Sequence, residues 1–371
     1  MGPYPHDAPP ATISDDNPMG TDGFEFVEYA SSEPQKLCRL FETLGFTAIA
    51  RHRSKDVTLY RQGDVNFVVN AEPDSFARRF AEMHGPCACA MAFRVVDAKH
   101  AFERAVALGA RPVATRVGPM ELNIPAIEGI GGSLLYFVDR YGEKGSIWDV
   151  DFRWTGEPDP RPEGAGLFYV DHLTHNVYRG NMEKWADWYA RLFNFRPIRY
   201  FNIAGRLTGL TSKAMCSPCG RIRIPINESA DQKSQIEEYL RDYKGEGIQH
   251  VACGCHDIYA SVQMLRERGV AFMPPPPDVY YEKVDGRLPR HGEPLDRLRD
   301  LGILIDGEGV LEGGYTKVLL QIFSKTVIGP IFFELIQRKG DEGFGEGNFQ
   351  ALFESIEEDQ IRRGVLKSDA A

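Results

Sequence analysis

Two histidines and one glutamate stand in strand-like segments, and together they could bind a metal ion. His172 and His250 lie in strand-like runs, and Glu334 lies within the apolar run 331–336. Two imidazoles and one carboxylate can hold Fe(II) on one face and leave the other coordination positions open. An unpartnered carboxylate is costly in an apolar run, and a metal ion would offset that cost. Each histidine alone is more often structural, so only the coincidence of all three favours a metal site.

The other histidines are weaker candidates for metal ligands. His172 and His175 are three residues apart and hence on opposite faces of a regular strand, so only one of them can face a site. His256 adjoins a predicted helix start and is assigned to a strand end or a cap. The remaining five are expected to be solvated, in tails, turns or helices: His6, His52, His84, His100 and His291.

The seven cysteines are an odd number in a chain too large to need disulfides. We therefore expect free thiols in a reducing compartment. The alternative is a zinc site formed by Cys216 and Cys219 together with Cys253 and Cys255. Only the first pair has suitable spacing, because the second pair lies in an apolar, strand-like run.

Amide and aromatic side chains near these runs indicate a pocket for an aromatic ligand that carries a hydroxyl group. Gln249 adjoins His250, Gln321 shares a strand pattern with Phe323, and Gln235 is a third candidate. Any single phenylalanine is more often a core residue.

An internal repeat divides the chain into two similar halves, each with two strand–helix–strands units. The matching segments are two amphipathic helices (34–46 and 183–195), two segments that run from a capping Asp to a terminal Gly (97–109 and 257–269), and two apolar strands (134–138 and 319–323).

The repeat gives a test of function, because polar residues present in only one half are candidates for chemistry. The first half has no histidine at the place of His172, and Ala90 stands opposite His250. The segment 148–150 is aligned with the position of Glu334. We therefore expect the first half to lack the metal ligands.

The repeat also sets the expected domain boundaries. We expect a disordered N-terminal tail (1–20), an N-terminal domain without metal ligands (21–153), a Pro- and Gly-rich linker (154–166) and a C-terminal catalytic domain (167–371). Within the last, the segment 344–366 opens with glycines and then reads as a helix. Such hinges suit a lid, although a docked surface helix is as common.

Charge and hydropathy exclude several classes of function. The chain has 371 residues and a formal net charge of −10, which argues against nucleic-acid and anionic-lipid partners. No run approaches the ~18 apolar residues of a membrane span. The first residues lack the features of a secretory signal. We expect a cytoplasmic protein.

Several motifs of the second half closely resemble the 4-hydroxyphenylpyruvate dioxygenase family. They are DHLTHNV (171–177), PINE (225–228), KSQIEEYL (233–240), GIQH (247–250), LLQIF (319–323) and GFGEGNFQALFESIE (343–357). The resemblance covers nearly all of the second half, and the first half is similar to the more divergent domain of the family. It implies an α+β, glyoxalase-like fold of the vicinal-oxygen-chelate type. In that fold each of two domains pairs βαβββ modules into an open barrel around a cavity, and a C-terminal helix acts as a gate.

The resemblance implies residue roles as well. Iron would be held by His172, His250 and Glu334. The implied catalytic residues are Ser212, Asn227, Gln235, Gln249 and Gln321. The implied substrate-binding residues are Phe323, Phe332, Phe344, Asn348 and Phe349.

The implied activity is that of a non-haem Fe(II) dioxygenase. It would convert 4-hydroxyphenylpyruvate and O2 to homogentisate and CO2, a step of tyrosine and phenylalanine catabolism, in a homodimer or homotetramer. The similar family of 4-hydroxymandelate synthases is one alternative, and Asn227 and Phe349 favour the dioxygenase over it. A non-catalytic small-molecule binding protein of the same fold is the other.

Overall fold

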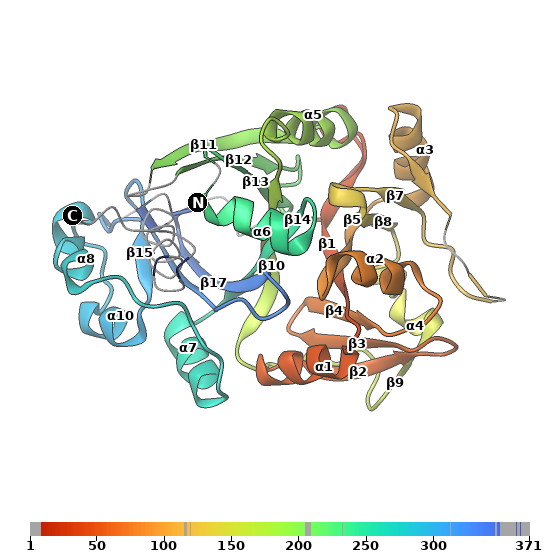
Figure 1. Cartoon of the computed structure of the whole chain (residues 1–371), viewed down its shortest axis with the longest axis horizontal. Coiled ribbons are helices and arrows are strands. Elements are labelled where there is room, and N and C mark those ends of the chain that lie inside the picture. Colours follow the sequence, from red (N-terminus) through yellow and green to blue (C-terminus); the bar gives the residue numbers. More distant parts are fainter. Residues whose placement is uncertain are drawn as a thin grey trace.

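The computed structural model places two curled β-sheets side by side, one from each half of the chain (Figure 1). It describes residues 9–114, 117, 118, 120–204, 209–231, 233–311, 313–345, 347, 348, 361 and 364. Within this part of the chain, no helix combines the length and the apolar character needed to cross a bilayer.

The first half forms a nine-stranded sheet in the order β6-β7-β8-β5-β1-β4-β3-β2-β9. Its strands are β1 (Thr21–Ala30), β2 (Thr47–His52), β3 (Val57–Gln62), β4 (Val65–Asn70), β5 (Cys87–Val95), β6 (Pro112–Val113), β7 (Ala126–Glu128), β8 (Leu134–Val138) and β9 (Phe152–Trp154). Its helices are α1 (Pro34–Thr43), α2 (Phe76–His84), α3 (Ala98–Ala107) and α4 (Trp148–Asp151), with short 3-10 turns at Ile130–Gly132 and Gly142–Lys144.

The second half forms an eight-stranded sheet in the order β11-β12-β13-β10-β14-β17-β16-β15. Its strands are β10 (Leu167–Val177), β11 (Arg196–Ala204), β12 (Gly209–Cys216), β13 (Arg223–Ser229), β14 (Gly247–Cys255), β15 (Leu304–Asp306), β16 (Val318–Phe323) and β17 (Phe332–Lys339). Its helices are α5 (Met182–Phe193), α6 (Gln235–Tyr243), α7 (Ile258–Glu267), α8 (Asp278–Glu282), α9 (Val284–Arg287) and α10 (Leu295–Leu301).

The two sheets share one pattern of pairing, which confirms the predicted architecture of paired βαβββ modules. In the first half β1 pairs in parallel with β4 and antiparallel with β5, and β5 pairs in parallel with β8. In the second half β10, β13, β14 and β17 pair in the same way. The second sheet curls until β11–β13 face β15–β17 across an interior (Figure 1). The predicted gating helix lies almost entirely outside the described residues.

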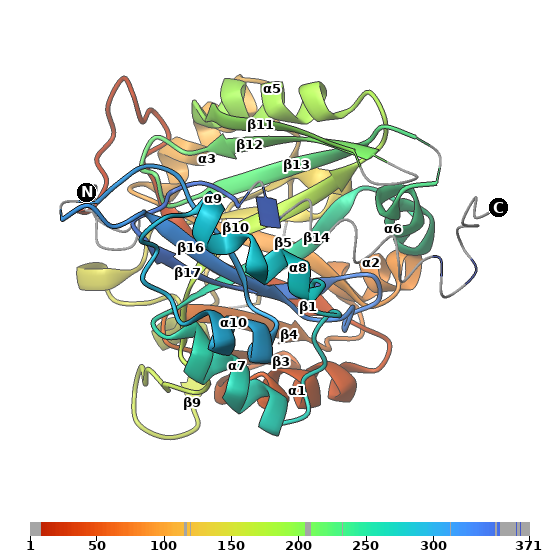
Figure 2. The same ribbon diagram turned by 90° about the vertical axis from the view of Figure 1, so that its left-hand side faces the viewer.

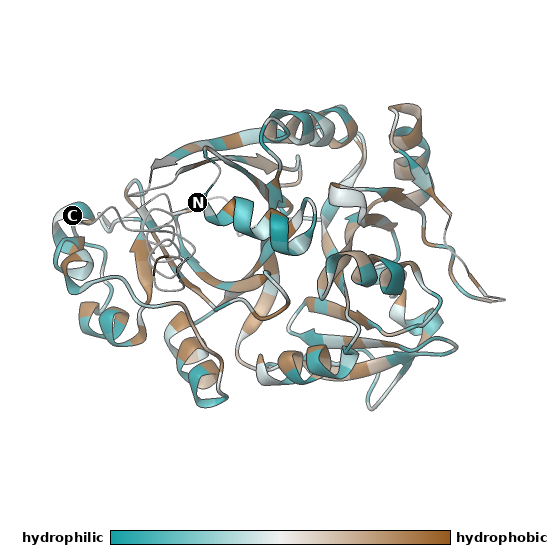
Figure 3. Cartoon of the chain, viewed as in Figure 1, coloured by the Kyte–Doolittle hydropathy of each residue, from teal (hydrophilic) through white to brown (hydrophobic). Residues whose placement is uncertain are grey.

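Local sequence explains why the predicted helices form. The side chains of Asp97 and Asp257 accept hydrogen bonds from backbone amides in the first turns of α3 and α7. Gly109 and Gly269 follow the helix ends with φ near +89°, which side chains with a Cβ rarely adopt. Each helix carries both hydrophobic and hydrophilic residues (Figure 3). Helix α5 lies over strands β11–β13 (Figure 2).

The sheet register corrects one alignment between the halves. Strand β8 pairs with β5 as β17 pairs with β14, so 134–138 corresponds to β17 and not to 319–323. Ala92 pairs with Tyr136, and Ala252 pairs with Glu334, so the counterpart of Glu334 is Tyr136. The predicted alignment of segment 148–150 with Glu334 is wrong, because this segment lies in helix α4 and not in a strand. The counterpart of β16 is β7, because β7 pairs antiparallel with β8 as β16 does with β17. Strand β7 has only three residues, so it contains no apolar run like that of β16.

Aromatic side chains fill the interior of the first sheet. Phe26 pairs with Ala92 as His172 pairs with Ala252, so Phe26 is the counterpart of a predicted metal ligand. Its ring lies 5.7 Å from the ring of Tyr136 and 5.7 Å from that of Trp148. The place that holds polar residues in the second sheet is therefore an apolar cluster in the first.

The two halves also share buried contacts. Phe333 of β17 lies 5.7 Å from the ring of Phe67 in β4. His84 at the end of α2 stacks on Tyr243 at 4.8 Å, and its Nδ1 lies 2.8 Å from the Tyr243 carbonyl oxygen. The expected solvation of His84 is therefore wrong, as it is for His291, because both side chains are buried.

Part of the expected disordered tail is packed against the protein. Asn17 is buried, its Oδ1 accepts a hydrogen bond of 2.9 Å from the Thr21 amide, and Met19 is fully buried. The prediction of disorder is therefore wrong for residues 17–20. Residues 1–8 lie outside the described part of the chain.

His175 makes the fold sensitive to acid. It is buried on the outer side of β10, its Nε2 lies 2.8 Å from the Tyr189 hydroxyl, and burial lowers its pKa to about 3. Below about pH 6.5 this histidine becomes protonated in the unfolded chain, whereas in the folded chain it stays neutral until the pH is close to 3. The folded state therefore loses stability as the pH falls from about 6.5 toward about 3, by roughly 1.4 kcal/mol per pH unit from this residue.

Urea unfolding at about pH 7, 6 and 5 checks this expectation. The free energy of unfolding should fall with acidification less steeply in His175→Gln than in the unaltered protein. Equal slopes for the two proteins would contradict it.

Candidate metal centre and substrate cavity

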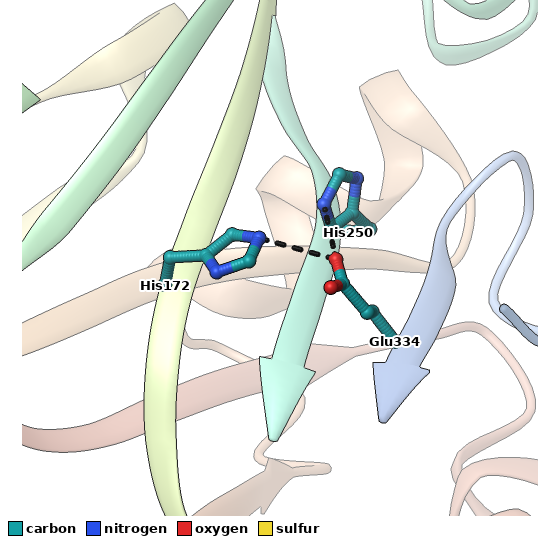
Figure 4. Close-up of side chains that lie close together, drawn as sticks. All are labelled: His172, His250 and Glu334. Atoms are coloured by element: carbon teal, nitrogen blue, oxygen red, sulfur yellow. Dashed lines mark ion pairs between the residues drawn. The ribbon is translucent and has the colours of Figure 1, made fainter. Parts of the chain in front are cut away.

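The three predicted metal ligands come together on neighbouring strands. His172 lies on β10, His250 on β14 and Glu334 on β17, and the strands are adjacent in the order β10-β14-β17. The His172 Nε2 is 3.1 Å from the Glu334 Oε2, and the His250 Nε2 is 3.3 Å from the same oxygen (Figure 4). One ligand atom from each residue lies within 4.8 Å of the others, and all three residues are buried.

The register explains why these side chains converge. His172 stands opposite Ala252, which stands opposite Glu334, so the three positions share one row across the sheet. His250 lies two residues before Ala252 and therefore on the same face. Phe333 and Leu335 point away from this face, toward the core. A shift of one residue in β17 would turn Glu334 outward.

The electrostatics of the cluster favour an ionised carboxylate. Burial alone would raise the pKa of Glu334, but the two imidazoles outweigh it and lower that pKa to about 2. Burial works against a charge on His172, yet Glu334 and Asp171 raise its pKa. The pKa of His250 is lowered, chiefly by burial. Two imidazoles beside a charged carboxylate are a donor set suited to a divalent transition metal.

A row of polar side chains crosses the same face of the sheet. Ser212, Asn227 and Asn176 stand opposite one another on β12, β13 and β10. All three are buried, and the Ser212 Oγ, the Asn227 Oδ1 and the Asn176 Nδ2 have no hydrogen-bond partner among the described residues. Three adjacent unpaired polar atoms are costly unless a ligand binds them.

Asn176 was not predicted from the sequence, although a signal was present. His172, Thr174 and Asn176 alternate along β10, so their side chains share one face. The Thr174 Oγ1 also lies 2.9 Å from the His250 Nε2. The motif DHLTHNV therefore brings further polar side chains to the site.

The predicted glutamines contact the polar row and the ligands. A change of register in β14 leaves Gln249 as an extra residue opposite Thr174 and His175, so its side chain lies on the same side as His250. Its Oε1 is 3.4 Å from the Asn227 Nδ2, and its Nε2 is 3.3 Å from the Gln235 Oε1.

Gln321 supports the carboxylate of Glu334. The Gln321 Nε2 donates to the Glu334 Oε1 at 2.8 Å and to the Phe344 carbonyl oxygen at 3.1 Å. Asn348 donates to the Gln321 Oε1 at 2.9 Å. Gln321 and Asn348 therefore hold the second oxygen of Glu334 in place.

Predicted aromatic residues surround the imidazoles. Phe332 stacks on His250 with ring centroids 4.7 Å apart, and Phe344 approaches His172 edge-on at 5.3 Å. Phe323 lies 6.5 Å from His250. The last predicted residue, Phe349, lies outside the described residues.

A cavity of about 630 Å³ lies next to this cluster, because Gln249 and Phe332, which both contact His250, are among its lining residues. Gln235 also lines this cavity, and His84 and Lys325 contribute to its lining from the two halves of the chain. Its volume lies in the range of small-molecule sites.

The cysteines do not belong to any group of possible metal ligands among the described residues. All seven cysteines are free, and His172, His250 and Glu334 are the one group of three or more possible metal ligands within the described ranges. The alternative of a zinc site at the two cysteine pairs is therefore wrong for this structure. His256 is outside the cluster, with its ring stacked on Phe168 at 3.7 Å.

Family models match both halves of the chain. Residues 15–153 match the model described as hydroxyphenylpyruvate dioxygenase, N-terminal. Residues 169–297 match the glyoxalase/bleomycin resistance protein/dioxygenase superfamily.

Two solved structures share the fold. A fusion protein of a xylose isomerase-like TIM barrel and 4-hydroxyphenylpyruvate dioxygenase is 33% identical with a TM-score of 0.77, over 95% of this chain and 54% of the fusion. A mutant of 4-hydroxymandelate synthase from Streptomyces coelicolor is 25% identical with a TM-score of 0.79, over 92% of this chain and 100% of the synthase.

Curated relatives are similar over nearly their whole lengths. Hemolysin VllY of Vibrio vulnificus is 62% identical, over 95% of this chain and 98% of its own. A 4-hydroxyphenylpyruvate dioxygenase from a Pseudomonas species is 58% identical, over 95% and 99%. The dioxygenase of Pseudomonas aeruginosa is also 58% identical, over 96% and 99%. This chain therefore belongs to the 4-hydroxyphenylpyruvate dioxygenase family.

Proposed function

We propose that this protein is an Fe(II)-dependent dioxygenase that converts 4-hydroxyphenylpyruvate and O2 to homogentisate and CO2. The observation that carries the proposal is the convergence of His172, His250 and Glu334 beside a row of unpaired polar atoms, in a chain of this family. A non-catalytic binding protein would have no need of a buried carboxylate between two imidazoles. The first sheet has the same topology and keeps none of the three ligands.

The donor set fits Fe(II). His172, His250 and Glu334 approach from three adjacent strands that form one wall of the interior, so the opposite side stays open for other ligands. When bound, Fe(II) supplies the redox chemistry by which O2 and a 2-keto acid react. The protein's own residues then hold the metal, orient the substrate and exclude water.

The polar row lies at a suitable distance to bind the phenol hydroxyl. Asn176 follows His172 by four residues on β10, a rise of about 13 Å along a strand. A substrate whose keto acid end lies at the metal ligands extends its ring toward this row. The unpaired atoms of Ser212, Asn227 and Asn176 offer donors and acceptors for the hydroxyl group.

The aromatic residues complete the pocket. Phe332, Phe323 and Phe344 surround the two imidazoles and are buried. They present ring faces and edges to an aromatic substrate and keep bulk water away from the ligands. Gln321 holds the Glu334 carboxylate by one oxygen, which leaves the other directed at the imidazoles.

Product analysis tests the activity directly. The protein should be reconstituted with Fe(II) without oxygen and then given 4-hydroxyphenylpyruvate and O2. We expect one O2 consumed for each homogentisate formed. Formation of 4-hydroxymandelate would assign the chain to the synthase activity, and binding without oxygen uptake would assign it to a non-catalytic role.

Removal of a ligand tests the metal site. His172→Ala and Glu334→Ala should each lose bound iron and reduce turnover by more than about 100-fold, while the circular dichroism spectrum is kept. His256→Ala is the matched control, because this exposed imidazole lies outside the cluster and should retain iron and activity. Iron bound in equal amounts by all three variants would overturn the ligand assignment.

Asn176→Leu tests the polar row. The variant keeps the size of the side chain and removes its hydrogen bonds, so kcat/KM for 4-hydroxyphenylpyruvate should fall by about tenfold with iron binding unchanged. Phenylpyruvate lacks the ring hydroxyl, so any turnover of it should be equal in the variant and the unaltered protein. An equal loss with both substrates would show that Asn176 does not bind the hydroxyl.

A further inference from the structure

A buried ion pair lies directly behind the proposed metal ligand His172. Asp171 precedes His172 on β10, and Arg338 lies on β17, four residues after Glu334. We propose that Asp171 and Arg338 are positioning residues, which fix the His172 imidazole for metal binding and couple it to the segment 341–344. This inference rests on the metal site proposed above.

Asp171 determines which nitrogen of His172 faces the site. The Asp171 Oδ1 lies 2.8 Å from the His172 Nδ1. A carboxylate oxygen only accepts hydrogen bonds, so the Nδ1 must carry the proton. The Nε2 is then the ring nitrogen that remains for a metal ion, and this atom faces Glu334 at 3.1 Å. A carboxylate in this place sets the tautomer and the ring orientation of a metal-binding histidine.

Arg338 and Tyr169 hold Asp171 in turn. The Arg338 Nε donates to the Asp171 Oδ2 at 2.7 Å, and the Arg338 Nη2 donates to the Oδ1 at 2.8 Å. The Tyr169 hydroxyl donates to the Oδ2 at 2.9 Å. Both ion-pair side chains are fully buried, so the pair has a single well-defined geometry.

The same guanidinium binds the chain that follows β17. The Arg338 Nη1 donates to the Gly343 carbonyl oxygen at 2.6 Å and to the Asp341 carbonyl oxygen at 3.2 Å. The Arg338 guanidinium also lies 5.8 Å from the ring centroid of Phe344, the residue whose ring approaches His172. One side chain therefore contacts both the carboxylate behind His172 and the segment in front of it.

A second connection joins this segment to the other side of the cluster. The Gln321 Nε2 donates to both the Phe344 carbonyl oxygen and the Glu334 Oε1. Residues 341–344 are thus tied to His172 through Arg338 and Asp171, and to Glu334 through Gln321. Occupancy of the metal site should therefore change the mobility of this segment, and disruption of the ion pair should change metal affinity.

Metal affinity tests the first part of the proposal without turnover. Co(II) is titrated into metal-free protein and followed by its visible absorption. We expect Asp171→Asn and Arg338→Lys to bind Co(II) about 10- to 100-fold more weakly than the unaltered protein. Tyr169→Phe removes one hydrogen bond to Asp171 and should give a smaller loss in the same direction, and it serves if the other two variants do not fold.

Arg61→Lys is the matched control for a purely structural effect. Arg61 is also buried, and it pairs with Asp159 and Asn66 in the first half of the chain. We expect this variant to lose thermal stability and to keep its Co(II) affinity. If Asp171→Asn, Arg338→Lys and Tyr169→Phe all bind Co(II) as tightly as the unaltered protein, the positioning role is refuted.

Hydrogen exchange tests the coupling. In the unaltered protein, Co(II) should slow amide exchange in residues 341–344, and in Arg338→Lys this slowing should be lost even at saturating Co(II). Slowing of equal size in both proteins would refute the coupling. If the unaltered protein binds Co(II) tightly but forms no homogentisate after reconstitution with Fe(II), the proposed function is refuted and this inference stands.

Discussion

A carboxylate charge buried between two imidazoles is the interaction on which the second half of the molecule depends. Glu334 cannot be ionised in that place unless His172 and His250 stay beside it, because an isolated charge in an apolar interior is very costly. The sheet register satisfies this requirement by aligning three neighbouring strands. The amide of Gln321 then pairs with the second oxygen of Glu334, and Asp171, held by Arg338, pairs with the Nδ1 of His172.

The two sheets show what the same topology does with and without that charge. Where the second sheet has His172 and Glu334, the first has Phe26 and Tyr136, and Trp148 packs against Phe26. At these two positions the first sheet therefore has rings packed in an apolar cluster and no metal-binding side chain. The difference between a core and a reaction site thus comes from a few residues on a common backbone.

Sequence reasoning succeeded where a single residue contradicted its surroundings. Glu334 is polar within an apolar run, and the repeat identified His172 and His250 as features of one half. It failed where partners are distant, since Arg338 and Asp171 are 167 positions apart and no local spacing links them. His84 was expected in solvent because its partner Tyr243 belongs to the other half. Phe349 and most of the predicted gating helix lie outside the described residues.

The contacts of Phe333 give the N-terminal half a structural role, because they cover the back of β17. On β17 this ring faces Phe67 and Phe41 of the first half, while the next residue, Glu334, faces the interior. The strand that carries the carboxylate thus packs from behind against the half of the chain that lacks counterparts of the three ligands. Loss of the N-terminal half would expose the apolar outer face of β17 to water. A protein that consisted of the second half alone would therefore need other side chains or a partner to bury this face.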